Sequence, residues 1–266
     1  MKTQPGLDQL ISLAGKNALI TGSASGIGKA IAHRFAEAGA SLSIVDNDGD
    51  ALAVTERELV AFGAQVVSLH VVDVSDKRAI DGLWANLDGR EPDILVNNAG
   101  IYPFRHFVDV DEAFYRHVME TNLNSVFWMC QQMIGQRRKQ GGIIINIGST
   151  DGIRPFNEEL SHYSVSKAGV IALTKTLAKE YAEHGFRVNA IVPGGILAPG
   201  AKAVGRQILK CKPGVLKTGI EYMKRLPIGR LGQPDEVARI ALVLASDLAS
   251  YVHGAIIPVD GGFLSA

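Results

Sequence analysis

Three side chains that together can move a proton occur close together in the sequence, namely Ser149, Tyr163 and Lys167. Residues four apart on a helix share one face, so the ammonium of Lys167 can lie near the phenol of Tyr163. A positive charge about 4 Å away, at an effective dielectric of roughly 20, is worth about 4 kcal/mol, or roughly three pKa units on a phenol. We therefore expect the pKa of Tyr163 to be lowered toward neutrality, where it can exchange protons.

A second group of residues could bind a phosphate. Gly22, Gly26 and Gly28 follow the apolar run 18–20 and accompany the start of an expected helix from Ile27 to Ala38. Glycines at such a turn let the main chain approach a pyrophosphate, and the helix N-terminus offers unpaired N–H groups. The strand, loop and helix context favours a dinucleotide site, with a purely structural turn as the alternative.

Short apolar runs that alternate with longer helical patterns must position both groups. This alternation predicts an α/β fold with a doubly wound parallel sheet, helices on both faces and ligands at the carboxyl ends of the strands. We expect one domain, 1–266, that binds the dinucleotide and carries the catalytic groups. The expected seven strands are 18–20, Leu42–Asp46, Val66–Val72, Ile94–Asn97, Ile143–Ile147, Val188–Val192 and Ala255–Val259.

One irregular stretch, 193–225, contains several proline and glycine residues and is expected to form loops around short helices that cover a substrate. Its centre, 202–217, carries basic residues and no acidic one. One hypothesis is a positive lid that attracts an anionic substrate, and the alternative is a solvated lysine-rich helix face. The basic residues are Lys202, Arg206, Lys210, Lys212 and Lys217.

The composition disfavours several classes of partner. The 27 basic and 27 acidic residues balance, so no overall field recruits nucleic acid or an anionic membrane. The N-terminal residues lack the apolar core of a signal peptide, and we expect a soluble cytoplasmic protein. Cys130 and Cys211 fit a reducing compartment. Seven His and two Cys do not form a metal-ligand pattern, so no metal is expected.

The order of further motifs resembles the short-chain dehydrogenase/reductase family over about residues 15 to 264. The resemblance implies a Rossmann-like fold, a nicotinamide cofactor and a catalytic Tyr-x-x-x-Lys pair. Its motifs are Thr21-Gly22-x-x-x-Gly26-x-Gly28, Asp73-Val74, Asn97-Asn98-Ala99-Gly100, Asn122, Ser149, Tyr163-x-x-x-Lys167, Pro193-Gly194 and Val259-Asp260-Gly261-Gly262.

Asp46 indicates which nicotinamide cofactor is used. It ends the expected second strand, where a carboxylate accepts hydrogen bonds from the ribose diol and repels a 2′-phosphate, so NAD is favoured over NADP. A solvated turn cap is the alternative for Asp46. Relatives often carry Thr at the position of Ala198, so we expect the nicotinamide to be anchored more loosely here or to be held by main-chain groups. The expected cofactor residues are Gly22, Ser25, Gly26, Ile27, Gly28, Asp46, Asp73, Val74, Asn98, Gly100, Tyr163, Lys167, Pro193 and Ile196.

The resemblance also implies roles in a hydride-transfer reaction between NAD(H) and a secondary alcohol or ketone. Tyr163 is expected to act as the acid or base and to bind the substrate together with Ser149, while Lys167 binds the nicotinamide ribose. Asn122 is expected to hold a water in a proton relay, with Asn124 as a weaker competitor. The structural alternatives are an interface Tyr163, a solvated Lys167 and a turn residue at Ser149.

Two other functions remain open. One is an NADPH-dependent 3-oxoacyl-thioester reductase on the same scaffold, which Asp46 disfavours. The other is a non-catalytic nicotinamide-binding regulatory protein, which would not need Tyr163. The residues Tyr102, Arg154, Asn157 and His162 are further candidates for the substrate pocket. The expected helices 111–138 and 163–184 resemble the pair that forms a dimer interface in the family, so a homotetramer is expected.

Overall fold

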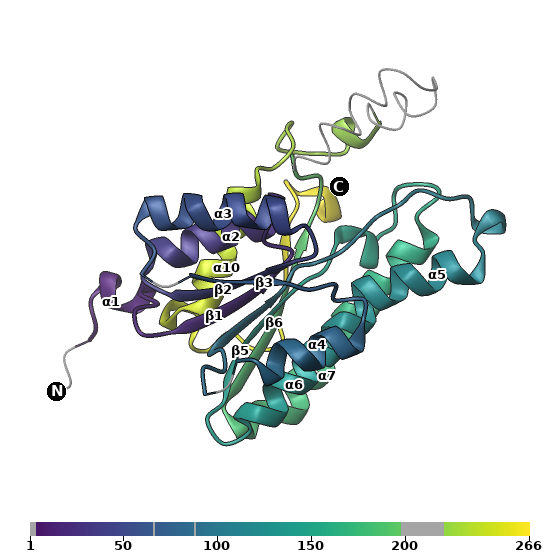
Figure 1. Ribbon diagram of the computed structural model, residues 1–266. Helices are drawn as coiled ribbons and strands as arrows, with labels where there is room; N and C mark the ends of the chain where they lie inside the picture. The colour runs from purple at the N-terminus through teal and green to yellow at the C-terminus, as the bar shows by residue number, and fades with distance from the viewer. Residues whose placement is uncertain (1–3, 66, 88, 198–220) are drawn as a thin grey trace.

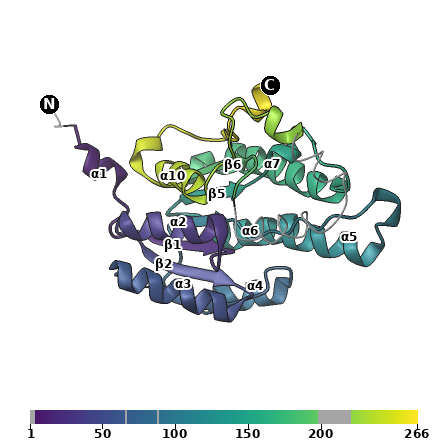
Figure 2. The ribbon, with the colours of Figure 1, turned by 90° about the horizontal axis from the view of Figure 1, so that it is seen from above.

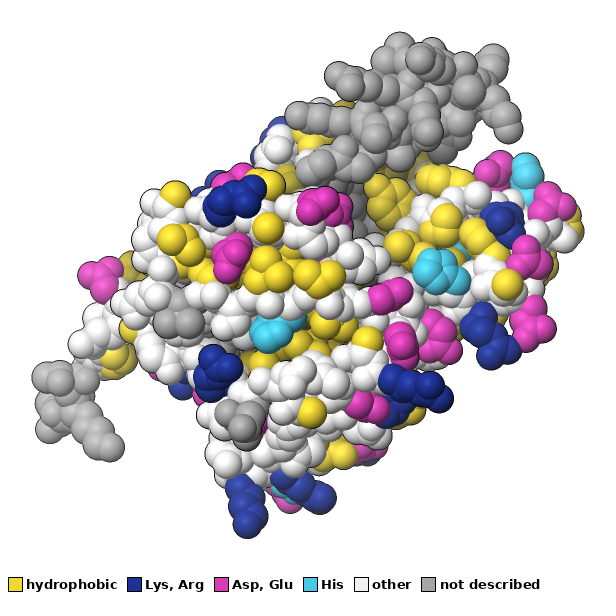
Figure 3. Space-filling model, in the orientation of Figure 1, with side chains coloured by type: hydrophobic (Ala, Val, Ile, Leu, Met, Phe, Trp, Pro, Cys, Tyr) yellow, Lys and Arg dark blue, Asp and Glu magenta, His cyan; other side chains and the backbone are white. Residues whose placement is uncertain are grey.

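The computed structural model describes residues 4–65, 67–87, 89–197 and 221–266. Ala198 and the basic segment 202–217 lie outside these ranges, so the lid hypothesis stays a prediction. Within the described ranges, no helix combines the length and hydropathy that crossing a bilayer requires. Basic and acidic side chains are interspersed over the face shown in Figure 3.

The strands of the described residues form one seven-stranded parallel sheet in the order β3-β2-β1-β4-β5-β6-β7 (Figure 1). The predicted doubly wound fold is therefore confirmed. Most residues of β1, β4, β5 and β6 are buried, as is usual in a parallel sheet that helices cover on both faces. Their bounds are β1 (Asn17–Thr21), β2 (Ser41–Asp46), β3 (Val67–Val71), β4 (Ile94–Asn97), β5 (Gly142–Ile147), β6 (Phe186–Pro193) and β7 (Ile256–Val259).

Helices cover both faces of the sheet (Figures 1 and 2). On one face, α2 (Gly26–Glu37), α3 (Gly49–Phe62) and α10 (Pro234–Ala245) bury an apolar cluster that includes Phe35, Leu59 and Leu244. An ion pair from Arg34 Nε to Asp235 Oδ1, 2.6 Å long, joins α2 to α10. These helices hold the N-terminus of α2 against the end of β1.

On the opposite face, a second apolar cluster includes Trp84, Met133 and Val170. The helices that contribute to it, or pack beside it, are α4 (Lys77–Ala85), α5 (Glu112–Met119), α6 (Ser125–Arg137) and α7 (Ser161–Tyr181). The short helix α1 (Leu7–Ile11) precedes the sheet. Single 3-10 turns occur at Phe107–Asp109, Thr150–Gly152, Ala182–His184, Asp247–Ala249 and Phe263–Ser265.

The helix expected over 111–138 is observed, but it is not α-helical throughout. A π-helical turn, Glu120–Asn124, separates α5 from α6. Local propensity does not predict such a turn, because it inserts an extra residue into a helix at a cost that tertiary contacts offset. Asn122 lies in this turn with its side chain fully buried, and the turn therefore sets the direction of that side chain.

Candidate active site

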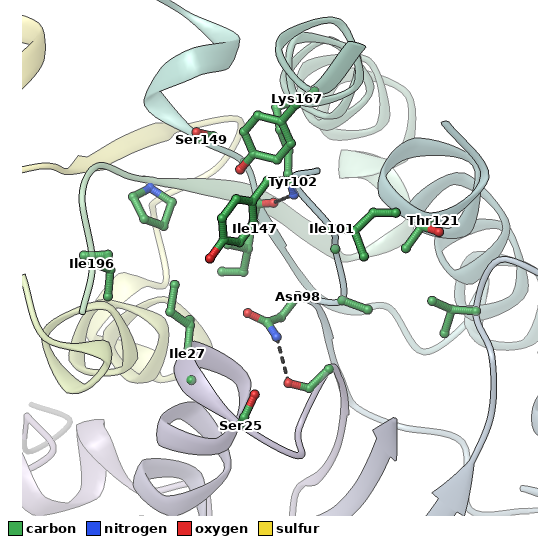
Figure 4. A pocket seen from close by; sticks show the side chains of 18 of the residues that line it. Ser25, Ile27, Asn98, Ile101, Tyr102, Thr121, Ile147, Ser149, Lys167 and Ile196 are labelled. Atoms are coloured by element: carbon green, nitrogen blue, oxygen red, sulfur yellow. Dashed lines mark hydrogen bonds between the residues drawn. The ribbon is translucent and has the colours of Figure 1, made fainter. Parts of the chain in front are cut away.

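One cavity of about 580 Å³ lies at the carboxyl ends of the strands, where the strand order reverses between β1 and β4. Ligands bind at this place in doubly wound sheets. Figure 4 shows Ser25, Ile27 and Asn98 toward one end of the cavity and Ser149, Tyr102 and Lys167 toward the other. Every cofactor and catalytic residue expected from the sequence lines it except Gly28 and Asn122: Gly22, Ser25, Gly26, Ile27, Asp46, Asp73, Val74, Asn98, Gly100, Ser149, Tyr163, Lys167, Pro193 and Ile196.

The glycine loop is packed too tightly for larger residues. Gly22 has φ +67°, which side chains rarely adopt, and a Cβ on Gly28 would lie 2.1 Å from the carbonyl oxygen of Gly22. The Nδ2 of Asn98 donates 3.0 Å hydrogen bonds to the carbonyl oxygens of Thr21 and Gly22. Asn98 therefore holds the loop against the end of β4, while the N-terminus of α2 stays open to the cavity.

Asp46 is half-buried at the end of β2 and lines the cavity. Its Oδ2 accepts a 2.9 Å hydrogen bond from the N–H of Ala24, and its Oδ1 accepts one from Asp48 at 3.2 Å. These bonds fix the carboxylate beside the glycine loop. Each carboxylate oxygen retains a second lone pair for an acceptor role. Asp46 thus caps the turn, as the alternative predicted, and it also lines the cavity.

At the other end, Ser149 follows β5, and Tyr163 and Lys167 project from α7. Ser149 lies close enough to Tyr163 to act on its phenol and lower its pKa. The N–H of Asp151 donates to Ser149 Oγ at 3.1 Å, so the hydroxyl proton of Ser149 remains available for donation. Lys167 Nζ donates to the carbonyl oxygen of Ile147 at 2.9 Å and lies 5.9 Å from the ring centre of Tyr163.

The sequence predicts that Lys167 brings the pKa of Tyr163 toward neutrality. For the side chains of the protein alone, without a cofactor, this prediction is wrong. Burial raises the pKa of Tyr163 to about 12, and Ser149 opposes this rise. Burial also lowers the pKa of Lys167 to about 8. Burial is the largest cause of both shifts, because a buried group loses the hydration that stabilises its charged form.

The π-helical turn places Asn122 against α7, the helix that carries Tyr163 and Lys167. Its Oδ1 accepts from the N–H of Ile101 at 2.8 Å, and its Nδ2 donates to the carbonyl oxygen of Ile101 at 2.8 Å and to Ser166 Oγ at 3.2 Å. A Cβ on Gly100 would lie 3.3 Å from Asn122 Oδ1 and 3.4 Å from Lys167 Nζ. Gly100 thus keeps a narrow space open between these two polar groups.

Two of the four further pocket candidates line the cavity. These are Tyr102, whose ring meets that of Tyr163 edge-on at 6.3 Å, and Asn157. Arg154 is instead exposed and donates to the main-chain oxygen of Ala266. His162 is buried and does not line the cavity, and its Nε2 lies 2.8 Å from the carbonyl oxygen of Pro103.

Asp151 lines the cavity and was missed as a functional residue. In the sequence it looks like a turn former before Gly152, although its position two residues after Ser149 could have indicated the pocket. Burial raises the pKa of its carboxyl group. In the described ranges, no three His, Cys, Asp or Glu side chains gather as a metal site.

Comparison with known proteins extends these observations to nearly the whole chain. The family model described as enoyl-(acyl carrier protein) reductase matches residues 22–264. The galactitol 2-dehydrogenase (L-tagatose-forming) of Cereibacter sphaeroides is 38% identical over 94% of this chain and 96% of its own. The 3-oxoacyl-[acyl-carrier-protein] reductase of Aquifex aeolicus is 36% identical over 95% and 98%.

A solved structure is similar to the same extent. The L-sorbose reductase of Gluconobacter frateurii, in complex with NADPH and L-sorbose, superimposes with a TM-score of 0.89 at 31% identity, and the match covers 97% of this chain and 99% of the reductase. With the glycine loop, Ser149, Tyr163 and Lys167 in one cavity, these matches show that the protein belongs to the short-chain dehydrogenase/reductase family of oxidoreductases.

Proposed function

We propose that the protein transfers a hydride between NAD(H) and a secondary alcohol or ketone. The observation that carries this proposal is that Ser149, Tyr163 and Lys167 line the same cavity as the glycine loop. The named activities of two relatives, a galactitol dehydrogenase and an L-sorbose reductase, belong to this reaction class.

The residues present fit a dinucleotide. Gly28 lies so close to the carbonyl oxygen of Gly22 that no larger side chain fits, so a pyrophosphate would approach main chain at the glycine loop. The first turn of α2 offers N–H groups to the pyrophosphate. When bound, the nicotinamide accepts or supplies the hydride. In this proposal Asp46 binds the adenosine ribose and disfavours a 2′-phosphate, so NAD is the expected cofactor.

Tyr163 takes the proton of the substrate hydroxyl as the carbonyl forms, and it returns the proton in the reverse direction. Ser149 donates a hydrogen bond to the same substrate oxygen and fixes its distance from the phenol. With a pKa of about 12, the phenol stays protonated near neutral pH, so positive charge at Lys167 and on the oxidised cofactor has to favour its ionisation during turnover. Asn122 remains the proposed site of a water that relays protons from Lys167.

The second candidate is an NADPH-dependent 3-oxoacyl-thioester reductase, which the similarity to the reductase of Aquifex aeolicus favours. Asp46 disfavours it, because its carboxylate opposes the 2′-phosphate of NADPH. Titration of the purified protein with NADH and NADPH, followed by nicotinamide fluorescence, separates the two candidates. Tighter binding of NADPH would reject our cofactor proposal.

Replacement of Tyr163 by Phe tests the catalytic proposal and the regulatory alternative together. We expect the variant to bind NADH like the wild type and to lose between about 100-fold and 10,000-fold in turnover of secondary alcohols. Turnover that the variant retains in full would remove Tyr163 as the acid or base. Absence of turnover by the wild type, despite NADH binding, would favour the regulatory reading.

We also propose that residues 1–266 act as one dinucleotide-binding and catalytic domain, in which 193–225 contacts the substrate. The proposed assembly is a homotetramer. The apolar side chains of Phe127 on α6 and Val165 on α7 are 44% and 51% exposed, and a partner subunit would cover them. A monomeric mass in light scattering at micromolar concentration would contradict it.

Cys130 is a buried free thiol, in keeping with a cytoplasmic location.

A further inference from the structure

Asp151 is a charged group in the catalytic cavity to which the proposed reaction assigns no role. It begins the segment that crosses from β5 to α7, and its own N–H donates to Ser149 Oγ at 3.1 Å. Its side chain is half-buried and lines the cavity near Tyr163. Its charge acts on the phenols of Tyr163 and Tyr222, whose pKa values it helps to raise. The carboxylate therefore lies within electrostatic reach of the reacting oxygen.

The carboxylate of Asp151 is fixed in place but not neutralised. Its Oδ1 accepts a 3.1 Å hydrogen bond from the N–H of Phe156, which orients the side chain. Asp151 takes part in no ion pair with any described residue. Lys167 is the one lysine or arginine among the described residues that line the cavity, and its Nζ donates to the carbonyl oxygen of Ile147 instead.

The lining of the cavity also includes neutral hydrogen-bonding groups and apolar groups. Asn157 belongs to the same segment, and Tyr102 lies across the cavity beside Tyr163. Leu160 and Phe104 supply apolar walls. A substrate with several hydroxyl groups finds acceptors and donors here, whereas a carboxylate or phosphate meets a like charge at short range.

We propose that Asp151 is a specificity-determining residue that accepts a hydrogen bond from a second hydroxyl of a neutral polyol or keto-sugar and rejects the corresponding anionic substrate. This inference rests on the proposed function, because it assumes that Ser149 and Tyr163 bind the reacting oxygen. The inference predicts a preference for neutral substrates, whereas a positive lid at 202–217 predicts a preference for anionic ones. One comparison of neutral and anionic substrates therefore decides between the two hypotheses.

A purely structural role makes a different prediction. If Asp151 served only to accept the N–H of Phe156, an asparagine would retain that acceptor, and substrate preference would not change. Asp151→Asn is therefore the informative variant, because it removes the charge and keeps the shape. Glu158→Gln is the matched control, since Glu158 is an exposed carboxylate of the same segment that does not line the cavity.

The experiment measures kcat/KM with NAD for neutral polyols and for the matched aldonates, in which one terminal carbinol is replaced by a carboxylate. We expect the wild type to prefer the neutral member of each pair by about tenfold or more. Asp151→Asn should lower this preference about tenfold, mainly through KM, while Glu158→Gln should leave it unchanged. NADH affinity and the unfolding midpoint of each variant show whether the fold is retained.

The outcomes separate this inference from the proposed function. Turnover that depends on Tyr163 but shows the same preference in Asp151→Asn and the wild type would overturn the role of Asp151 alone. A wild type that prefers the aldonates would overturn it in favour of the positive lid. Failure to oxidise any polyol or aldonate, by a protein that oxidises other secondary alcohols with NAD, would overturn the inference and leave the proposed reaction standing. Failure with every secondary alcohol, although NADH binds, would overturn the proposed reaction as well.

Discussion

Lys167 is anchored by the strand that leads to Ser149: its Nζ donates a 2.9 Å hydrogen bond to the carbonyl oxygen of Ile147, two residues before the serine. Lys167 is 4% exposed. The bond fixes the ammonium beside the catalytic serine and tyrosine while burial disfavours its charge. Protein stability and the proposed roles of Lys167 in proton transfer and cofactor binding therefore depend on one side chain.

Lys167 makes the stability of the protein depend on pH in a defined window. Its pKa is about 8 in the folded protein and about 10.5 in the unfolded chain, so between these values the unfolded chain binds more protons. The contribution of Lys167 to the free energy of unfolding should thus rise with pH, by about 2 kcal/mol between pH 7 and 9.5. Cys130 opposes this rise above about pH 9 in every variant, because burial raises the pKa of its thiol to about 12. Urea unfolding at several pH values should show this rise in the wild type and not in Lys167→Met.

Lys175→Met is the control for this experiment, because Lys175 lies on the same helix and is exposed. It should keep the full rise. Measurements stop at pH 9.5 because Tyr163 has a raised pKa, which lowers stability as the pH passes from about 10 toward 12. A rise that persists in Lys167→Met would assign the effect to another group.

Asp46→Asn should weaken the discrimination between NADH and NADPH by about tenfold. The substitution removes the charge that opposes a 2′-phosphate, and it retains an oxygen that can accept from the N–H of Ala24. Fluorescence titration with both cofactors measures the ratio of dissociation constants. Asp50→Asn, an exposed residue in the first turn of α3, should leave the ratio unchanged. Equal ratios in all three proteins would place cofactor selection elsewhere.

Asn122→Ala should destabilise the protein by roughly 2 to 4 kcal/mol and lower turnover at least about 100-fold. The substitution leaves the N–H and carbonyl groups of Ile101 without their partners. Asn124→Ala should cost less than about 1 kcal/mol, because Asn124 is half-buried and its side chain caps no helix. Urea unfolding and initial rates test both effects, and similar losses in the two variants would argue against a special role for Asn122.

Asp151→Asn should move the pH dependence of alcohol oxidation to lower pH by about one unit. The groups that face the phenol of Tyr163 are Ser149, which lowers its pKa, Asp151 and Tyr102, which raise it, and Lys167. Loss of a negative charge favours the phenolate, so the apparent pKa of kcat/KM falls. An unchanged profile, with activity retained, would mean that Asp151 acts too weakly on Tyr163 to matter in catalysis.

The sheet could be predicted from the sequence because its strands are buried on both faces and therefore stand out as apolar runs. Ile94–Asn97 is predicted and observed with the same bounds, and the other strands differ at their ends by a few residues. Val66, the first residue of the expected third strand, lies outside the described residues. The cavity also follows from the sequence, since the carboxyl ends of these strands meet there.

Three features of the site depend on tertiary structure and could not be predicted. The π-helical turn at Asn122 is stabilised by hydrogen bonds to Ile101 and Ser166, which are distant in the sequence. The raised pKa of Tyr163 results from burial by segments that come together only on folding. Asp151 resembles an ordinary turn residue until the fold directs it into the cavity.

The π-helical turn also changes the rotational phase of the helix that contains it. Val118 and Val126 are both buried although they are eight residues apart, a spacing that would separate them by about 80° on a regular helix. One surplus residue in the turn reduces this offset to about 20°. The apolar stripe therefore continues on both sides as though that residue were absent. Loss of a single residue from 120–124 would leave the apolar stripe in phase but turn the amide of Asn122 away from Ile101. The length of this segment therefore affects the active site without affecting the packing of the core.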